Sequence, residues 1–209
     1  ALVLEPTNAA KRRIIVTAQR FVLGLFPDAR TSDFRANKSV KVISDATGRS
    51  QRKSETTSDS LEANFDSSTG ILNRLRQRGK FTYRDPDRQA RAQEADYVVA
   101  KSSILLSGEP MVWDDEGKLT AKRIEMKTEG GGLTAEGNVA STFVQKPASG
   151  GQVGEPLHAV ADRLEYDGTR RTSQFQGHAR LWQGESFLVE GDSIDWSPSA
   201  GELEARKKV

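Results

Sequence analysis

The chain has 209 residues, with 31 Lys and Arg against 29 Asp and Glu, and a net charge of +2. Hydrophobic residues make up 35% and aromatic residues 7%, below the roughly 45–50% apolar content of an ordinary globular chain, so we expect a thin-walled or extended architecture in place of a thick core. The absence of cysteine excludes disulfides, thiolate metal sites and cysteine nucleophiles. No stretch reaches 18 consecutive apolar residues, so we expect no membrane-spanning helix. The chain begins with Ala1 and not Met, which we take as a sign of processing or trimming.

The first elements fall in residues 9–26. Their apolar residues fit an amphipathic helix, but they also fit the alternating pattern that the rest of the chain follows, and we expect strands here.

A glycine recurs at a fixed interval from residue 79 onward. Gly79, Gly108 and Gly137 are 29 residues apart, and Gly177 keeps this spacing once the Gly/Pro-rich stretch 146–156 is set aside as an inserted loop. Residues two and four positions on either side of each glycine are mostly apolar, with polar residues between them. Alternation of this kind is typical of a strand with one buried face, and a glycine inside it indicates a bend or bulge.

A second motif precedes each glycine. Residues 161–166 (ADRLEY) match residues 121–126 (AKRIEM) position by position, and residues 58–61, 95–98 and 191–196 follow the same frame. Loops such as residues 66–70 and 114–117 have turn chemistry. We therefore predict one all-β domain over residues 1–209, built of stacked repeat units. The predicted units are 18–45, 58–84, 95–114, 121–144 and 161–183, with a half-unit at 187–209.

Catalytic signals are weak. His158 and His178 lie in no motif with a nucleophile or a second histidine, so we interpret both as solvated surface residues. The acidic run at residues 114–116 ends in Gly117, which favours a hairpin turn over a metal site. The recurring Asp96, Asp162 and Asp192 indicate a structural role. We expect no enzyme activity, no cofactor and no metal.

The densest basic stretch is Arg74, Arg76, Arg78 and Lys80, which alternate along one strand. They are candidate contacts for the phosphates of a lipid headgroup, although a solvated outer face that resists edge aggregation explains them too. No aromatic residues are interleaved with them for stacking on bases, so we expect no nucleic-acid binding.

The apolar face is the most informative feature, because its residues either pack against each other or line an open trough. The pattern leaves both possibilities open. The candidate lining residues are Leu75, Phe81, Ile104, Leu106, Val112, Ile124, Met126, Leu133, Val139, Leu164, Tyr166, Phe175, Leu181, Ile194 and Trp196.

Three stretches carry a resemblance to a known family: residues 161–167 (ADRLEYD), 175–181 (FQGHARL) and 189–194 (VEGDSI). They resemble the OstA-like repeat of periplasmic lipopolysaccharide-transport proteins (LptA, LptC and the amino-terminal domain of LptD). The resemblance is clear over 95–209, weaker over 58–94 and faint before 58.

The resemblance implies an elongated, open, V-shaped β-jellyroll whose apolar inside holds the acyl chains of lipid A. It also implies a periplasmic location, with or without a tether formed by a segment outside residues 1–209. The implied partners are lipopolysaccharide and other transport proteins stacked through edge strands, including further copies of this chain. Two other readings stay open: a structural β-repeat scaffold with a dry interior, and an enzyme acting on polysaccharide.

Overall fold

The structure is a computed structural model that describes residues 2–4, 12–46, 53–128, 130–144, 154–185 and 187–207. It is all-β, as predicted, and the described residues contain one short 3-10 helix, η1 (Val99–Lys101). Strands β2 and β3 stand where an amphipathic helix was the alternative, which confirms the strand interpretation. The strands are β1 (Leu2–Leu4), β2 (Arg12–Thr17), β3 (Arg20–Leu25), β4 (Thr31–Ala46), β5 (Lys53–Phe65), β6 (Leu72–Arg84), β7 (Gln89–Val98), β8 (Ser103–Ser107), β9 (Met111–Trp113), β10 (Gly117–Thr120), β11 (Arg123–Lys127), β12 (Leu133–Phe143), β13 (Leu157–Asp167), β14 (Thr172–Gln183), β15 (Phe187–Ser197) and β16 (Glu202–Arg206).

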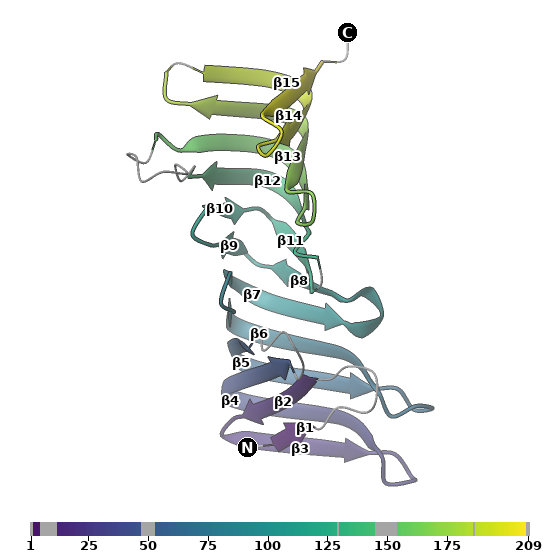
Figure 1. Ribbon diagram of the computed structural model, residues 1–209. Helices are drawn as coiled ribbons and strands as arrows, with labels where there is room; N and C mark the ends of the chain where they lie inside the picture. Colours follow the sequence, from purple (N-terminus) through teal and green to yellow (C-terminus); the bar gives the residue numbers. More distant parts are fainter. Residues whose placement is uncertain are drawn as a thin grey trace. The chain divides into compact units, whose positions relative to one another are not determined.

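The chain forms two compact units, unit 1 (Ala1–Leu106) and unit 2 (Ser107–Val209). In unit 1, antiparallel pairing joins β1, β2, β4, β5, β6 and β7 in that order, and β3 also pairs with β4. In unit 2, the order is β11, β12, β13, β14, β15 and β16, with β9 and β10 joined to β12. Neighbours in sequence are mostly neighbours in the sheet (Figure 1), as expected for a repeat-built chain. The predicted loop 146–156 lies largely outside the described residues.

Three of the recurring glycines mark a bulge inside a long strand, as the sequence predicts, in β6, β12 and β14, whereas Gly108 lies between β8 and β9. Gly79, Gly137 and Gly177 have φ values of 78°, 76° and 74°, and the residue after each is also left-handed. The strand register shifts at the same places, between Arg78 and Phe81 in β6 and between Gln176 and Ala179 in β14. The pattern continues in β4 without a glycine, where Lys38 and Ser39 take the two left-handed positions. An extra residue of this kind bends the strand and strengthens its twist.

Glycine is required at these bulges by crowding as well as by backbone angle. A Cβ on Gly177 would lie 2.8 Å from the Cβ of Asp162, and one on Gly79 would lie 2.8 Å from the Cβ of Asp59. Both aspartates belong to the motif that precedes each glycine. Asp59 and Asp162 thus each cover a bulge on the next strand, which is a structural role of the kind expected for Asp162, whereas Lys122 takes this place at Gly137.

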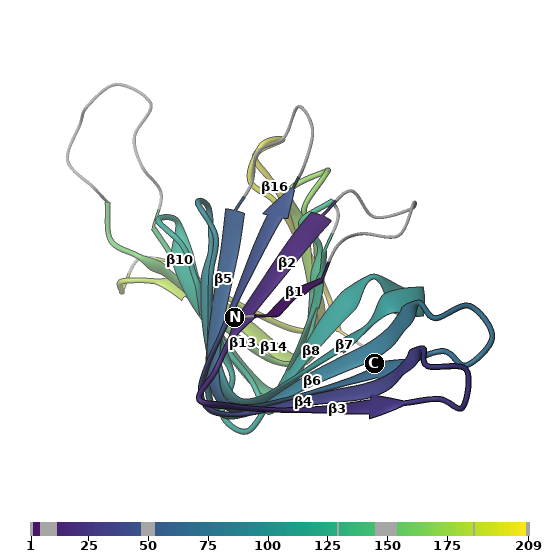
Figure 2. The same cartoon turned by 90° about the horizontal axis from the view of Figure 1, so that it is seen from below.

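Each unit bends along its row of bulges into two limbs, because every bulge lies in the middle of its strand. In unit 1, β3 pairs with residues 31–37 of β4 and β2 with residues 41–46, and Figure 2 shows β2 and β3 on different limbs. We call the limb that contains β3 in unit 1, or β16 in unit 2, the A limb, and the other the B limb. The A limb of unit 2 comprises residues 123–136, 163–176 and 193–206, and its B limb comprises 111–120, 139–143, 157–161 and 179–191.

The core lies on the inner face between the limbs. In unit 1, Phe34 and Leu61 of the A limb and Val16 and Val40 of the B limb belong to one buried cluster. In unit 2, Phe175 is equally buried. Burial of each such side chain stabilises the fold by about 1.5–3 kcal/mol. In unit 1, side chains of both limbs thus form one core.

Aspartates order the turns between strands. Asp66 accepts hydrogen bonds from Ser68 and Thr69 after β5, which lower its pKa to about 2. Asp114 accepts from the backbone of Glu116 and Gly117. The acidic run at 114–116 is therefore a hairpin turn, as expected from its sequence.

Candidate functional site

The structure places the fifteen predicted lining residues in two groups. Ten are almost fully buried, and five are only half-buried. The buried group is Phe81, Leu106, Val112, Ile124, Met126, Val139, Leu164, Phe175, Leu181 and Ile194. The half-buried group is Leu75, Ile104, Leu133, Tyr166 and Trp196. The alternation of apolar and polar residues thus predicts burial well. The role of the fifteen residues in lipid binding stays a prediction.

Three half-buried residues of unit 2 form part of a single cross-strand row. The row, which we call the mouth row, lies at the edge of the A limb where the turns after β11, β13 and β15 are found. Leu133 pairs with Tyr166, Tyr166 with Ser173, Ser173 with Trp196, and Trp196 with Leu203. The next row inward carries Leu164, Phe175 and Ile194, which are 0–3% exposed.

Two contacts join the A limb to the B limb across the mouth of unit 2. The rings of Phe143 on the B limb and Trp196 on the A limb meet edge to face, with centroids 5.0 Å apart. Arg171, in the turn after β13, donates to both carboxylate oxygens of Glu116, in the turn after β9, at 2.9 and 2.7 Å. We call these four residues the mouth bridge. Of these four residues, only Trp196 is among the lining residues predicted from the sequence, although Phe143 continues the alternation of Val139.

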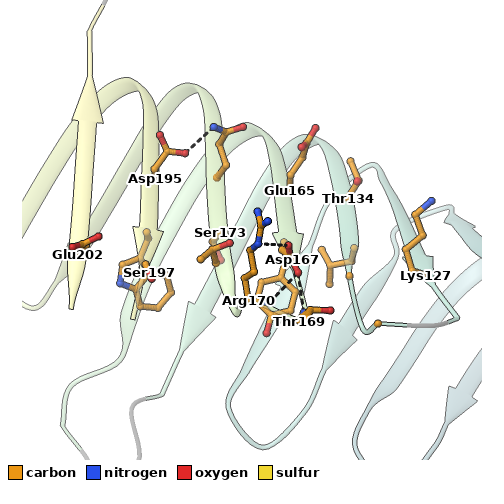
Figure 3. A pocket seen from close by; sticks show the side chains of 18 of the residues that line it. Lys127, Thr134, Glu165, Asp167, Thr169, Arg170, Ser173, Asp195, Ser197 and Glu202 are labelled. Carbon is orange, nitrogen blue, oxygen red and sulfur yellow. Dashed lines mark hydrogen bonds and ion pairs between the residues drawn. The ribbon is translucent and has the colours of Figure 1, made fainter. Parts of the chain in front are cut away.

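A pocket of about 690 Å³ lies at the turn edge of the A limb of unit 2. Figure 3 shows Asp167, Thr169 and Arg170 of the turn after β13 side by side at this pocket, with Lys127 and Glu202 toward its opposite ends. Its lining combines members of the mouth row with charged and amide side chains. The mouth-row members are Leu133, Tyr166, Ser173 and Trp196, and the polar members include Lys127, Thr134, Glu165, Asp167, Arg170, Gln174, Asp195, Glu202 and Glu204.

The basic stretch of β6 lies on the outer face of unit 1, opposite carboxylates of β7. Arg74 and Arg76 both pair with Asp96, and the hydrogen bond from Arg74 is the main reason that the pKa of Asp96 is lowered.

Glu94 on the same strand pairs with Arg76 and Arg78, at 3.0 and 3.3 Å. These two carboxylates offset half of the four positive charges that the sequence places here. Lys80, at the left-handed position of the bulge, is exposed.

The two histidines lie in different surroundings. The side chain of His178 is 91% exposed and bonds Asp162 at 2.8 Å, an interaction that raises the pKa of the imidazole. His178 is thus the solvated residue predicted. His158 is half-buried instead, because its ring stacks on Trp182 at 5.3 Å and bonds Thr142 at 3.2 Å.

Among the described residues, no three His, Asp or Glu side chains gather closely enough to hold a metal ion. Over the same ranges, none of the helical structure has the length and apolar character that crossing a bilayer requires.

The family model described as LptA/(LptD N-terminal domain) LPS transport protein matches residues 28–132, half of the chain. The match starts where the repeat motif is faint and stops before its clearest copies.

One similar solved structure is that of LptH, the LptA homologous periplasmic component of the conserved lipopolysaccharide transport device from Pseudomonas aeruginosa. It is 20% identical, with a TM-score of 0.49, over 58% of this chain and 82% of that chain. No curated protein matches the sequence.

Proposed function

Because the chain belongs to the LptA/LptD N-terminal domain family of lipopolysaccharide transport proteins, we propose that it is a periplasmic, non-enzymatic transport component. In this proposal, the inner faces of its bent sheets hold the acyl chains of lipid A. The fifteen predicted lining residues form the binding surface, in each unit separately.

The observation that carries this proposal is the separation of apolar and charged residues between the two faces of one bent sheet. In β14, Ser173, Phe175, Ala179 and Leu181 are buried on the inner face, while Arg180 is exposed on the outer face. Burial of an acyl chain against such a face yields about 0.8 kcal/mol per CH₂ group and has no preferred direction. A chain held in this way can slide without breaking hydrogen bonds.

In this structure, side chains fill the space that an acyl chain would occupy. We propose that the chain enters at the mouth row, where Tyr166 and Trp196 are only half-buried. Entry then requires the mouth bridge to open, with contacts to Phe143 replaced by contacts to the acyl chain. Such a replacement exchanges one apolar surface for another, so its free-energy change is small.

For the headgroup, Lys80 is the strongest of the four predicted cationic contacts. Its side chain is exposed at the bulge, whereas Arg74, Arg76 and Arg78 are engaged by Glu94 and Asp96, as described above. We therefore propose Lys80 as a phosphate contact and the three arginines as mainly structural.

The edge strands of the two units are suited to pairing with partner proteins. Within the described residues, β3 pairs with β4 alone and β16 with β15 alone. The side chains of Phe21, Leu23 and Leu25 on β3 are 36–56% exposed. An open, apolar strand edge is suited to strand addition, and we propose that other transport proteins, or further copies of this chain, stack there.

A second candidate function is a structural scaffold whose interior is permanently dry. The near-complete burial of Leu106, Ile124 and Leu181 favours it, since each is fully covered by protein atoms.

Photo-crosslinking to lipopolysaccharide separates the two functions. A photoreactive phenylalanine analogue replaces Phe175 on the inner face or Gln176, its neighbour on the outer face; in unit 1 the same pair is Phe81 and Thr82. We expect crosslinks from the two inner positions and none from the two outer ones. A folded protein that crosslinks from neither inner position would be a dry scaffold, and the transport proposal would be abandoned.

A further inference from the structure

Two polar side chains are buried on the inner faces of the sheets, one in each unit. Among the residues that the structure describes, three buried side-chain polar atoms have no hydrogen-bond partner. Two of them are Oε1 of Gln77 in unit 1 and Oγ of Ser141 in unit 2, whose residues are 3% and 5% exposed. The third, Nε of Arg76, is on the outer face and lies 3.0 Å from a carboxylate oxygen of Glu94.

We propose that Gln77 and Ser141 each bind a hydroxyl group carried by an acyl chain, so that both units prefer hydroxylated chains to plain ones. This inference rests on the proposed function, and it names the class of acyl chain that the inner faces select. A single polar atom within an apolar lining matches a ligand that is apolar except at one point.

The amide of Gln77 joins the two limbs of unit 1 and still has one atom without a partner. Its Nε2 donates to the hydroxyl oxygen of Thr56 at 2.8 Å. Gln77 pairs with Leu61 on the A limb, and Thr56 pairs with Val42 on the B limb. With the amide turned over, the atom without a partner would be Nε2 in place of Oε1. A ligand hydroxyl satisfies either arrangement, because it both donates and accepts a hydrogen bond.

The cross-strand neighbours of the two polar residues are alike, since each has a leucine on one adjacent strand and an alanine on the other. These neighbours are Leu61 and Ala95 for Gln77, and Leu119 and Ala159 for Ser141. All four are buried, and none of their side chains can donate or accept a hydrogen bond. On the alanine side, an entering acyl chain has the least side-chain volume to displace, and its hydroxyl would lie beside the polar atom.

The burial of a polar atom without a partner is costly for the protein alone. The atom loses its hydrogen bonds to water, and an apolar side chain of similar shape would avoid that cost. A hydroxylated acyl chain gives the atom a partner, whereas a plain chain of the same length does not. Because both chains bury nearly the same apolar surface, the hydrogen bond decides the difference between their affinities.

A buried water molecule is the competing partner, because water also donates and accepts hydrogen bonds. If water serves the two atoms while an acyl chain is bound, a hydroxylated chain has no advantage over a plain one. A comparison of the two kinds of chain therefore separates the two partners.

Competition for the crosslinks to lipopolysaccharide tests each unit separately. The whole 209-residue chain carries the photoreactive analogue at Phe81 in unit 1 or at Phe175 in unit 2. Tetradecanoic acid, 3-hydroxytetradecanoic acid and 12-hydroxytetradecanoic acid are the competitors. The hydroxyl stands near either end of the chain in the last two, so that one of them brings it to the polar atom whichever end enters first.

Four variants accompany the competition. Gln77→Leu replaces the amide by an apolar side chain of similar size, and Ser141→Ala removes one oxygen atom. Gln93→Leu and Ser199→Ala are the matched controls, because both residues are exposed. Circular dichroism verifies folding. Should Gln77→Leu fail to fold, Ser141→Ala carries the test in unit 2.

We expect one hydroxylated acid to displace the crosslink at a concentration roughly three- to ten-fold lower than tetradecanoic acid requires. Gln77→Leu should remove this preference at Phe81 and keep it at Phe175, and Ser141→Ala should do the reverse. Both controls should keep it at both positions. The same acids are compared in wild type and variant, so differences in their solubility cancel. Equal displacement by plain and hydroxylated acids would overturn the proposal for that unit, as would a preference that survives the unit's own variant.

The proposal and the function it rests on fail in different ways. If lipopolysaccharide crosslinks at Phe81 and Phe175 but all three acids compete equally, the hydroxyl preference is refuted and the acyl-binding face stands. If the folded protein crosslinks at neither position, both are refuted, because the inner faces then hold no acyl chain.

Discussion

Replacement of Gly177 by alanine tests whether the bulges need glycine for space as well as for backbone angle. Its φ of 74° is a left-handed value, which costs a residue with a Cβ about 1–2 kcal/mol. The new Cβ would also lie 2.4 Å from Oδ2 and 2.8 Å from Cβ of Asp162. Relief of such crowding costs about 1–3 kcal/mol more. We therefore expect Gly177→Ala to lower the free energy of unfolding by about 2–5 kcal/mol.

Gly201 provides the matched control. Its φ is 68°, but a Cβ there would meet nothing within 4 Å, so Gly201→Ala should lose only the backbone contribution of about 1–2 kcal/mol. Asp162→Gly removes all three crowding atoms, and in that background Gly177→Ala should be about 1–3 kcal/mol less damaging.

Urea unfolding followed by tryptophan fluorescence is the assay, because Trp113, Trp182 and Trp196, the only tryptophans of the chain, all belong to unit 2, as does Gly177. Equal losses for Gly177→Ala and Gly201→Ala would refute the crowding argument.

Three other perturbations test the charged contacts. Asp96→Asn should lower the free energy of unfolding by about 1–2 kcal/mol in urea melts. Because its arginine partners lower the pKa of Asp96, the wild type should lose this contribution as the pH falls below 3.8. If wild type and variant lost stability equally over that pH range, the ion pairs of Asp96 would not be its source. The raised pKa of His178 means that its bond to Asp162 contributes fully below pH 6.5 and is lost as the pH rises through the raised value. His178→Ala should therefore flatten the dependence of Tm on pH above 6.5. Calorimetry measures Tm, and if the pH dependence persisted in the variant, another titrating group would be its cause. Arg171→Ala, which frees Glu116, should leave stability nearly unchanged because the pair is exposed, yet it should speed the uptake of a fluorescent fatty acid in stopped flow; an unchanged rate would argue against the mouth bridge as a barrier.

Most of the fold could be predicted from the sequence because one device recurs. The glycine at 79, 137 and 177 marks the bulge, the preceding motif supplies the side chain that covers it (Asp59, Lys122 and Asp162), and alternation assigns each side chain to a face. Lys38 shows why the frame could be followed even without a glycine: the apolar residues on both sides of it keep the same spacing.

The candidate site could be predicted only in part. Alternation tells which face a side chain occupies, but it does not tell how far that residue lies from the edge of the sheet. Leu164 and Tyr166 alternate in the same way, yet one is buried and the other lies at the mouth. The contacts of Phe143 with Trp196 and of Glu116 with Arg171 join residues over 50 positions apart, and no local pattern indicates them.

The bulge in the middle of every second long strand also bears on how such a molecule changes length during evolution. Each long strand contributes to both limbs, so one additional hairpin extends both limbs by the same amount and brings its own bend. Duplication of a single hairpin therefore leaves the cross-section of the bent sheet unchanged. Loss of one residue within a strand would instead turn every side chain up to the next turn to the opposite face of the sheet. Selection can thus change the number of strands one hairpin at a time, while the strand length within each limb stays the same.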